Sequence, residues 1–199
     1  EVGGNTYPKG GLISIDLDEF LAGGRDFDVI FEPSERVSLA GTSSTKGKLL
    51  LATLDNVRSR LYEVTREDGQ WERTEISLPG IGSVGLAATS DEHDFYFLTY
   101  NDPLTPSSLY VKRPGQEPEQ IKSTPSYFDP TGMDVVQYEA KSADGTMIPY
   151  FMITPKGYEA NGQNPTLLYG YGGFEVPMLP RYSAASGKAW VERGGVYVT

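Results

Sequence analysis

The chain has 199 residues, no cysteine, one histidine and a formal net charge of −10 from 17 Lys and Arg against 27 Asp and Glu. The length is enough for a sizeable hydrophobic core, and 38% hydrophobic residues exclude a disordered chain. The lack of cysteine excludes disulfides, thiolate metal sites and a cysteine nucleophile. The negative charge disfavours nucleic acid, and no apolar run has the roughly 18 residues of a membrane span. We therefore predict no cofactor, no nucleic-acid partner and no membrane contact, and composition does not decide between cytoplasm and periplasm.

Short strand-type runs dominate the chain up to about residue 122. Strands are predicted at residues 12–17, 48–53, 60–64, 94–100 and 108–112. Turn residues separate them, as at Asp68-Gly69 and Pro114-Gly115. Helical periodicity is nearly absent here, apart from one short turn predicted at residues 18–23.

The strand runs repeat. Leu12, Leu61 and Leu109 begin similar strands just under fifty residues apart, and matching apolar strands precede the second and third. Such a period, with about four short strands per unit, is typical of β-propeller blades, because one blade cannot bury both of its faces. Residues 12–122 hold a little over two units, which predicts an incomplete ring with open blade faces. A β-sandwich with evenly spaced hairpins is the alternative.

The pattern changes after Pro130. Two strands at residues 133–140 and 147–154 are predicted to form a hairpin with Asp144-Gly145 in its turn. A strand covered on both faces, a helix and a closing buried strand are predicted at residues 166–169, 184–192 and 195–199. This order is the opening of an α/β domain, which predicts two domains, 1–130 and 131–199. The apolar run at the last residue suggests a segment of a longer protein.

The most informative stretch is YGYGGF at residues 169–174. Three glycines after a strand permit tight turning and close approach of the backbone. A tyrosine hydroxyl there can donate to the negative oxygen that develops in acyl transfer. The alternative is a simple turn whose aromatic side chains pack. A dinucleotide site is disfavoured, because Glu175 stands where the fingerprint needs its third glycine.

Three pieces of the second region carry a resemblance to a known family. DGTMIPYF at residues 144–151, PKG at 155–157 and NPTLLYGYGGF at 164–174 closely resemble, in order and spacing, the entry into the catalytic domain of the prolyl oligopeptidase family of serine peptidases. The loop ends in Gly-Gly-Phe, as in the prolyl endopeptidase branch, whereas dipeptidyl-peptidase-like relatives usually carry Gly-Gly-Pro. The resemblance implies a mainly β fold, with the last two to three blades of a partial β-propeller followed by the first strands of an α/β-hydrolase domain.

The resemblance also implies roles for individual residues. Tyr171 matches the tyrosine whose hydroxyl stabilises the tetrahedral intermediate, and Phe174 matches the aromatic residue that lines the pocket for the substrate proline. Val176 stands where the family usually has a second apolar pocket residue. Glu175 departs from the small polar residue common at its position.

The catalytic triad is missing from this sequence. No Gly-x-Ser-x-Gly occurs, and in this fold serine, aspartate and histidine follow the glycine-rich loop in that order. The resemblance thus implies a parent serine endopeptidase that cleaves short peptides after proline, and a chain that is inactive alone. His93 and the neighbouring carboxylates Asp91, Glu92 and Asp94 are predicted to form a solvated turn, not a triad or a calcium site.

Two further expectations concern partners. The parent enzyme is expected to bind short proline-containing peptides, and open strand edges could let the isolated chain self-associate. A non-catalytic binding module of the propeller type, or an inactive peptidase homologue, is the alternative function.

Overall fold

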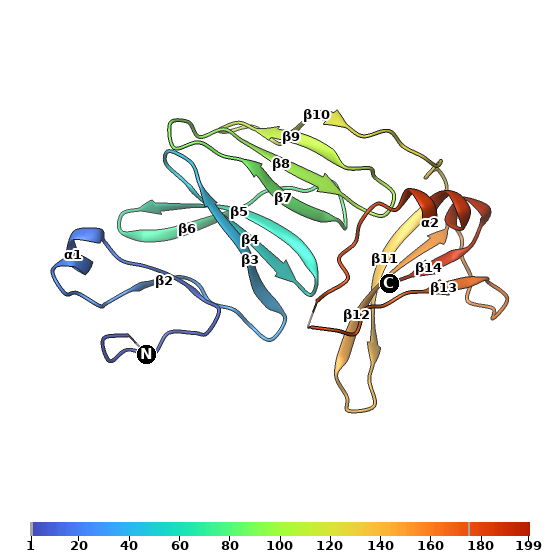
Figure 1. Cartoon of the computed structure of the whole chain (residues 1–199), viewed down its shortest axis with the longest axis horizontal. Coiled ribbons are helices and arrows are strands. Elements are labelled where there is room, and N and C mark those ends of the chain that lie inside the picture. Colours follow the sequence, from blue (N-terminus) through green and yellow to red (C-terminus); the bar gives the residue numbers. More distant parts are fainter. Residues whose placement is uncertain (1, 175) are drawn as a thin grey trace.

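A computed structural model describes residues 2–174 and 176–199, and its regular structure is mainly β (Figure 1). Two four-stranded antiparallel sheets pack against each other. A two-stranded sheet precedes them, and a mixed four-stranded sheet follows. The predicted mainly β fold is confirmed.

The first three sheets are successive units of one repeat. The first two strands are β1 (Leu12–Ser14) and β2 (Asp28–Phe31). The next sheet holds β3 (Val37–Ser44), β4 (Leu49–Asp55), β5 (Arg58–Glu67) and β6 (Gln70–Glu75). The last holds β7 (Ser83–Ala88), β8 (Tyr96–Asn101), β9 (Ser108–Lys112) and β10 (Glu119–Ser123). The repeated leucines fall in the equivalent strands β1, β5 and β9, which confirms the predicted repeat.

Hydrophobic cores lie between successive sheets. Leu51 and Val64 pack with Phe31 of β2, whereas Leu50 and Leu61 pack with residues of β8 and β9. Strand β4 is therefore covered on both faces, and this explains its unbroken apolar run. Stacking of sheets face to face is the packing of propeller blades.

A buried carboxylate joins the two complete blades, which are the four-stranded sheets β3–β6 and β7–β10. Glu63 on β5 lies 3.2 Å from the Nζ of Lys112 on β9, and it also pairs with Lys48. The hydroxyl of Tyr96 donates to the same carboxylate at 3.2 Å. Burial tends to raise the pKa of Glu63, but the hydrogen bonds from the two lysines outweigh it and the pKa is lowered. The blades thus share a charged contact beside their hydrophobic core.

Two strands are shorter than predicted because an aspartate at one end accepts hydrogen bonds from groups outside the strand. The strand predicted at residues 12–17 stops at Ser14, since the Asp16 carboxylate caps helix α1 (Leu17–Leu21) by accepting from the N–H of Asp18 at 2.9 Å. The strand predicted from residue 94 begins at Tyr96. Asp94 turns away and accepts hydrogen bonds from Thr45 and Gly47 at 2.9 and 2.7 Å.

The hairpin turns differ in how well their residues suit them. The β5–β6 turn uses Asp68 and Gly69, both with positive φ, as its sequence predicts. The β4–β5 turn has the same length, but its two residues are Asn56 (φ 50°) and Val57 (φ 61°). A β-branched residue in the left-handed region is strained.

Replacing Val57 with glycine is expected to raise the free energy of unfolding by about 1 kcal/mol. Relief of a left-handed conformation that costs about 1–2 kcal/mol outweighs the added freedom of glycine in the unfolded chain. Chemical denaturation measures the change. Ser59→Gly, two residues further on in strand β5, serves as the control and should destabilise; an equal loss in both variants would show that Val57 is not strained.

The last sheet is mixed. It contains β11 (Met133–Lys141), β12 (Met147–Pro155), β13 (Thr166–Leu168) and β14 (Val196–Val198) in the order β11-β12-β14-β13. Strands β13 and β14 run parallel, and β11 and β12 form the predicted hairpin. The hairpin and the parallel pair follow the order of strands that the sequence predicts.

Strand β13 corrects one prediction. It was expected to be covered on both faces, but Leu167 is 44% exposed and Leu168 75% exposed. Burial of a parallel strand needs covering layers on both faces. Strand β13 is exposed at all three of its positions, so the described part of the chain does not supply covering layers for its faces.

The predicted helix at residues 184–192 is shorter than expected. Helix α2 spans Ala184–Ala189 and gives way to a 3-10 turn, η1 (Val191–Arg193). Trp190 leaves the helical conformation, and its indole N–H donates to the carbonyl of Val196 at 2.8 Å. Gly187 is explained by packing, because a Cβ there would lie 2.1 Å from the ring of Phe128.

Polar contacts hold the blades against the mixed sheet. Arg36 pairs with Glu139 of β11 at 2.6 Å, and the side-chain amide of Asn56 donates to the same carboxylate at 3.0 Å. The Gln137 amide donates to the carbonyl of Asn56 at 2.6 Å. Two hydrogen bonds therefore join Asn56 of the strained β4–β5 turn to strand β11.

Candidate functional site

The glycine-rich loop leaves the mixed sheet at the carboxyl end of β13. The parallel ladder continues to Tyr169, whose N–H donates to the carbonyl of Val198 at 2.9 Å. The chain then departs from the sheet through residues 170–174. The carboxyl ends of parallel strands are where α/β proteins commonly bind ligands. The sequence-predicted site thus lies at a suitable edge.

Tyr171 and Phe174 are presented outward from this loop. Tyr171 is 49% exposed and Phe174 93% exposed. The hydroxyl of Tyr171 folds back toward Gly173, where an added Cβ would lie 3.3 Å away. Phe174 has a left-handed backbone (φ 57°), and a strained conformation at a bulky residue is more common at functional sites.

Val176 follows directly on the loop. Its N–H donates to the carbonyl of Gly173 at 3.2 Å, and its side chain is 49% exposed. Glu175, which departs from the family pattern, lies outside the described residues. The three predicted site residues Tyr171, Phe174 and Val176 therefore belong to one open loop segment.

The segment after the loop runs between the blades and strand β12 (Figure 1). Ser83 of β7 donates to the carbonyl of Pro180 at 2.7 Å, and the N–H of Tyr182 donates to the Asn101 side chain at 3.1 Å. The Tyr182 ring also stacks on Phe128, with centroids 5.2 Å apart. The segment after the loop is thus tied to the β7–β10 sheet and to the connection before β11. These contacts could not be predicted from sequence, because the partners are far apart along the chain.

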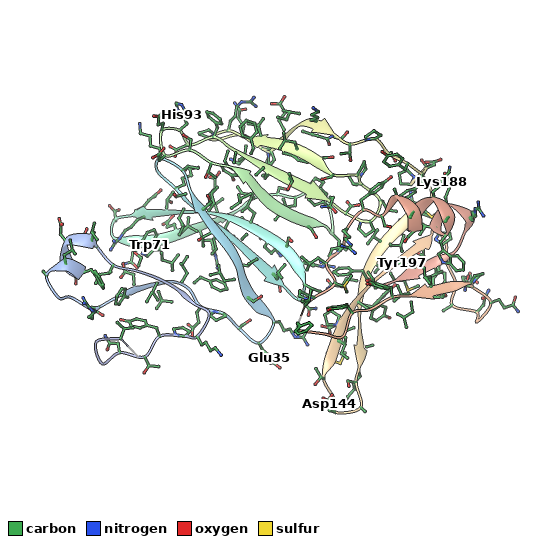
Figure 2. All side chains as sticks on the ribbon, viewed as in Figure 1. Glu35, Trp71, His93, Asp144, Lys188 and Tyr197 are labelled. Atoms are coloured by element: carbon green, nitrogen blue, oxygen red, sulfur yellow. The ribbon has the colours of Figure 1, made fainter. Side chains whose placement is uncertain are left out.

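His93 lies at the end of its blade that points away from the mixed sheet (Figure 2). It is exposed in a turn and stacks on Phe95 with ring centroids 5.3 Å apart. Asp94 accepts hydrogen bonds that lower its pKa, chiefly one from the backbone of Gly47. The prediction of an exposed turn histidine is confirmed.

Residues 2–174 and 176–199 contain neither a candidate metal site nor a candidate membrane helix. No group of three or more His, Cys, Asp or Glu side chains is arranged to hold a metal ion. No helix in these ranges has the length and apolar character to cross a membrane.

Chemically, the loop offers a hydrogen-bond donor and an apolar aromatic surface. The phenol of Tyr171 can donate to an oxygen that becomes negative, and the exposed ring of Phe174 can pack on a flat apolar ring of a ligand. Stacked blades that lead into a mixed sheet define the class as a β-propeller protein with a following mixed sheet, and the loop lies at the carboxyl edge of that sheet.

The particular family follows from comparison with known proteins. The family model described as prolyl oligopeptidase, N-terminal beta-propeller domain, matches residues 3–123, which is more than half of the chain. The chain belongs to the prolyl oligopeptidase family, as its sequence motifs predicted. The first three sheets are therefore part of that family's propeller.

Individual relatives agree with this assignment. An uncharacterized peptidase of Sinorhizobium fredii, y4nA, is 39% identical over 197 residues, which cover 98% of this chain and 27% of the relative. The prolyl endopeptidase of Elizabethkingia miricola is 31% identical over 174 residues, 85% of this chain and 23% of the relative. The solved structure of a post-proline cleaving enzyme from Rickettsia typhi has a TM-score of 0.81 at 29% identity and is matched over 98% of this chain and 29% of its own. The chain spans about a quarter of the length of these relatives.

Proposed function

We propose that this chain is part of a longer serine endopeptidase that cleaves short peptides after proline. In this proposal residues 1–130 belong to the propeller and residues 131–199 begin the peptidase domain. The observation that carries it is the loop at the end of β13, which exposes Tyr171 and Phe174 together. Relatives named prolyl endopeptidase support the substrate class.

Each loop residue has one role in the proposed reaction. A serine hydroxyl from the rest of the protein gives its proton to a base that also lies there and attacks the carbonyl carbon of the substrate proline, so the carbonyl oxygen becomes negative; the protonated base later gives the proton to the leaving amine. The Tyr171 hydroxyl donates to that oxygen, while Phe174 packs on the proline ring and Val176 forms a further apolar wall. Collapse of the intermediate releases the amine and leaves an acyl-enzyme, which water then hydrolyses.

The isolated chain is expected to be inactive in this proposal. Its sequence has no Gly-x-Ser-x-Gly, and its single histidine lies in a blade turn. The nucleophile and base must therefore come from other residues of the longer protein. The propeller would restrict access to short peptides.

A chromogenic peptide with its leaving group attached to proline tests the proposal. The longer protein should release the chromophore, and the same peptide with alanine in place of proline should react more slowly. The 199-residue chain alone should give no release above buffer. Turnover by the isolated chain would show that the triad assignment is wrong, and an inactive longer protein without a downstream Gly-x-Ser-x-Gly would favour a binding module.

We also propose that the isolated chain self-associates through open strand edges. Strand β13 has one unpaired edge among the described residues, and its side chains are exposed. An exposed apolar edge is a template for pairing with another chain. The apparent mass in size-exclusion chromatography should rise with concentration, and a constant monomer mass would contradict this.

A further inference from the structure

A cavity of about 640 Å³ lies between the first complete blade and the β11–β12 hairpin. The connection before β3, the strained β4–β5 turn, the hairpin tip and the segment after the glycine-rich loop form its walls. The lining includes Glu35, Arg36, Asn56, Val57, Val176 and Pro177. Its volume is in the range of ligand pockets. Apart from Val176, no residue with a role in the proposed reaction lines this cavity.

The cavity adjoins the proposed proline pocket. Val176 lines it, and Val176 is two residues from Phe174. Two residues of extended chain span at most about 7 Å. A peptide whose proline lies on Phe174 therefore reaches the cavity within a few residues.

The blade wall of the cavity is held in one conformation. Asn56 is bonded from its side chain to Glu139 at 3.0 Å and from its carbonyl to Gln137 at 2.6 Å. Val57 beside it keeps its left-handed backbone. A preformed wall lowers the entropic cost of binding.

The cavity lining contains one acidic and one basic residue, and they differ in whether they are paired. The guanidinium of Arg36 is paired with Glu139 at 2.6 Å, whereas Glu35 has no ion pair among the described residues. Figure 2 shows Glu35 at the end of the blade nearest the hairpin, whose tip carries Asp144. A cationic side chain entering here would meet a free carboxylate and lose no existing pair.

We propose that this cavity is a substrate subsite that binds a lysine or arginine side chain a few residues from the scissile proline. The proposal rests on the proposed peptidase function and extends it to substrate sequence. Glu35 would be the residue that determines this preference, and the apolar lining would hold the aliphatic part of the cationic side chain.

Peptides that differ at one position test the subsite in the longer protein. Lysine, glutamine or glutamate is placed at each of the second to fourth residues on either side of proline, and kcat/KM is measured. At one position lysine should exceed glutamate by about five- to tenfold, the size expected of a partly exposed charge pair. Glu35→Gln should remove most of that preference, and Glu35→Lys should reverse it.

Two controls make the result specific. Glu32→Gln changes a carboxylate of the same connection that lines a different cavity, and it should leave the preference intact. Ser38→Trp fills the proposed subsite and should lower kcat/KM for long peptides while sparing a minimal chromogenic substrate. Unchanged lysine preference in Glu35→Gln, or equal losses on short and long substrates in Ser38→Trp, would overturn the subsite.

Failure of the peptidase function would be seen separately. If the wild-type protein does not turn over the minimal substrate, the proposed function fails. Calorimetric binding of a lysine-containing proline peptide to wild type and Glu35→Gln then still decides the subsite. Tighter binding by wild type supports it, and equal binding refutes it.

Discussion

Replacing Tyr171 with phenylalanine in the longer peptidase is expected to lower kcat about 10²- to 10³-fold. The change removes one hydroxyl and keeps the ring, so the loop should fold as before. Loss of a single oxyanion donor costs about 2.7–4 kcal/mol of transition-state stabilisation. KM should change little, because the hydroxyl is proposed to act mainly on the charge that develops in the transition state.

Tyr169 offers a matched control for this experiment. It belongs to the same loop and is 45% exposed, against 49% for Tyr171. Its backbone is fixed to β14, and no role in the reaction is proposed for its hydroxyl. Tyr169→Phe should keep kcat within a few fold of wild type. Equal losses in the two variants, or no loss in Tyr171→Phe, would remove the assigned role.

Replacing Glu63 with alanine is expected to lower the free energy of unfolding by about 3–5 kcal/mol. The change leaves two lysine ammonium groups at the contact between the blades without their shared partner. Lys112 is the more affected, since its side chain is only 8% exposed. Breaking a buried ion pair by removing one partner has about this cost.

Chemical denaturation of the chain measures this loss, with Glu72→Ala as the control. Glu72 is an exposed carboxylate on the neighbouring strand β6, and its removal should change stability by less than about 0.5 kcal/mol. A loss of under 1 kcal/mol in Glu63→Ala would show that the cluster does not hold the blades together.

The same carboxylate predicts a pH dependence. Because the pKa of Glu63 is lower in the folded chain than in the unfolded one, its contribution is complete above the unfolded value of 4.5. It is lost as the pH falls through the lower folded value. Wild type should therefore lose more stability than Glu63→Gln between pH 5 and acid pH, and parallel curves would contradict the lowered pKa.

The blade architecture could be predicted from sequence because it repeats. Leu12, Leu61 and Leu109 mark equivalent strands, and their spacing alone indicates blade length. The apolar run at residues 49–52 also has a simple cause, since β4 is buried on both faces. Burial that repeats from blade to blade produces a repeating pattern of apolar residues in the sequence. This pattern can be recognised without knowing which residues are in contact.

Other features could not be predicted because they depend on distant partners. The Arg36–Glu139 pair joins residues about a hundred positions apart, and neither residue has a local signal for it. The exposure of Leu168 could not be predicted, because the apolar run at residues 166–169 is typical of a strand in a sheet that is covered on both faces. Left-handed Val57 was missed because its residue type disfavours that conformation.

The candidate site also has parts that the sequence predicts and parts that it does not. From the loop residues alone, a simple glycine-rich turn is an equally valid interpretation. The roles of Tyr171, Phe174 and Val176 come from the resemblance to the family. The structure adds that all three share an open loop at the carboxyl end of β13. The cavity beside Val176 could not be found from sequence, because four separate segments form it.

The central claim is that the Tyr171 hydroxyl stabilises an oxyanion, and a structure of the longer protein tests it most directly. The protein would be crystallised with a peptide aldehyde or boronic acid that ends in proline and mimics the tetrahedral intermediate. The account predicts the Tyr171 hydroxyl about 2.7–3.1 Å from the oxygen of the bound tetrahedral group. A tyrosine turned away from that oxygen, with other donors completing its hydrogen bonds, would contradict the account.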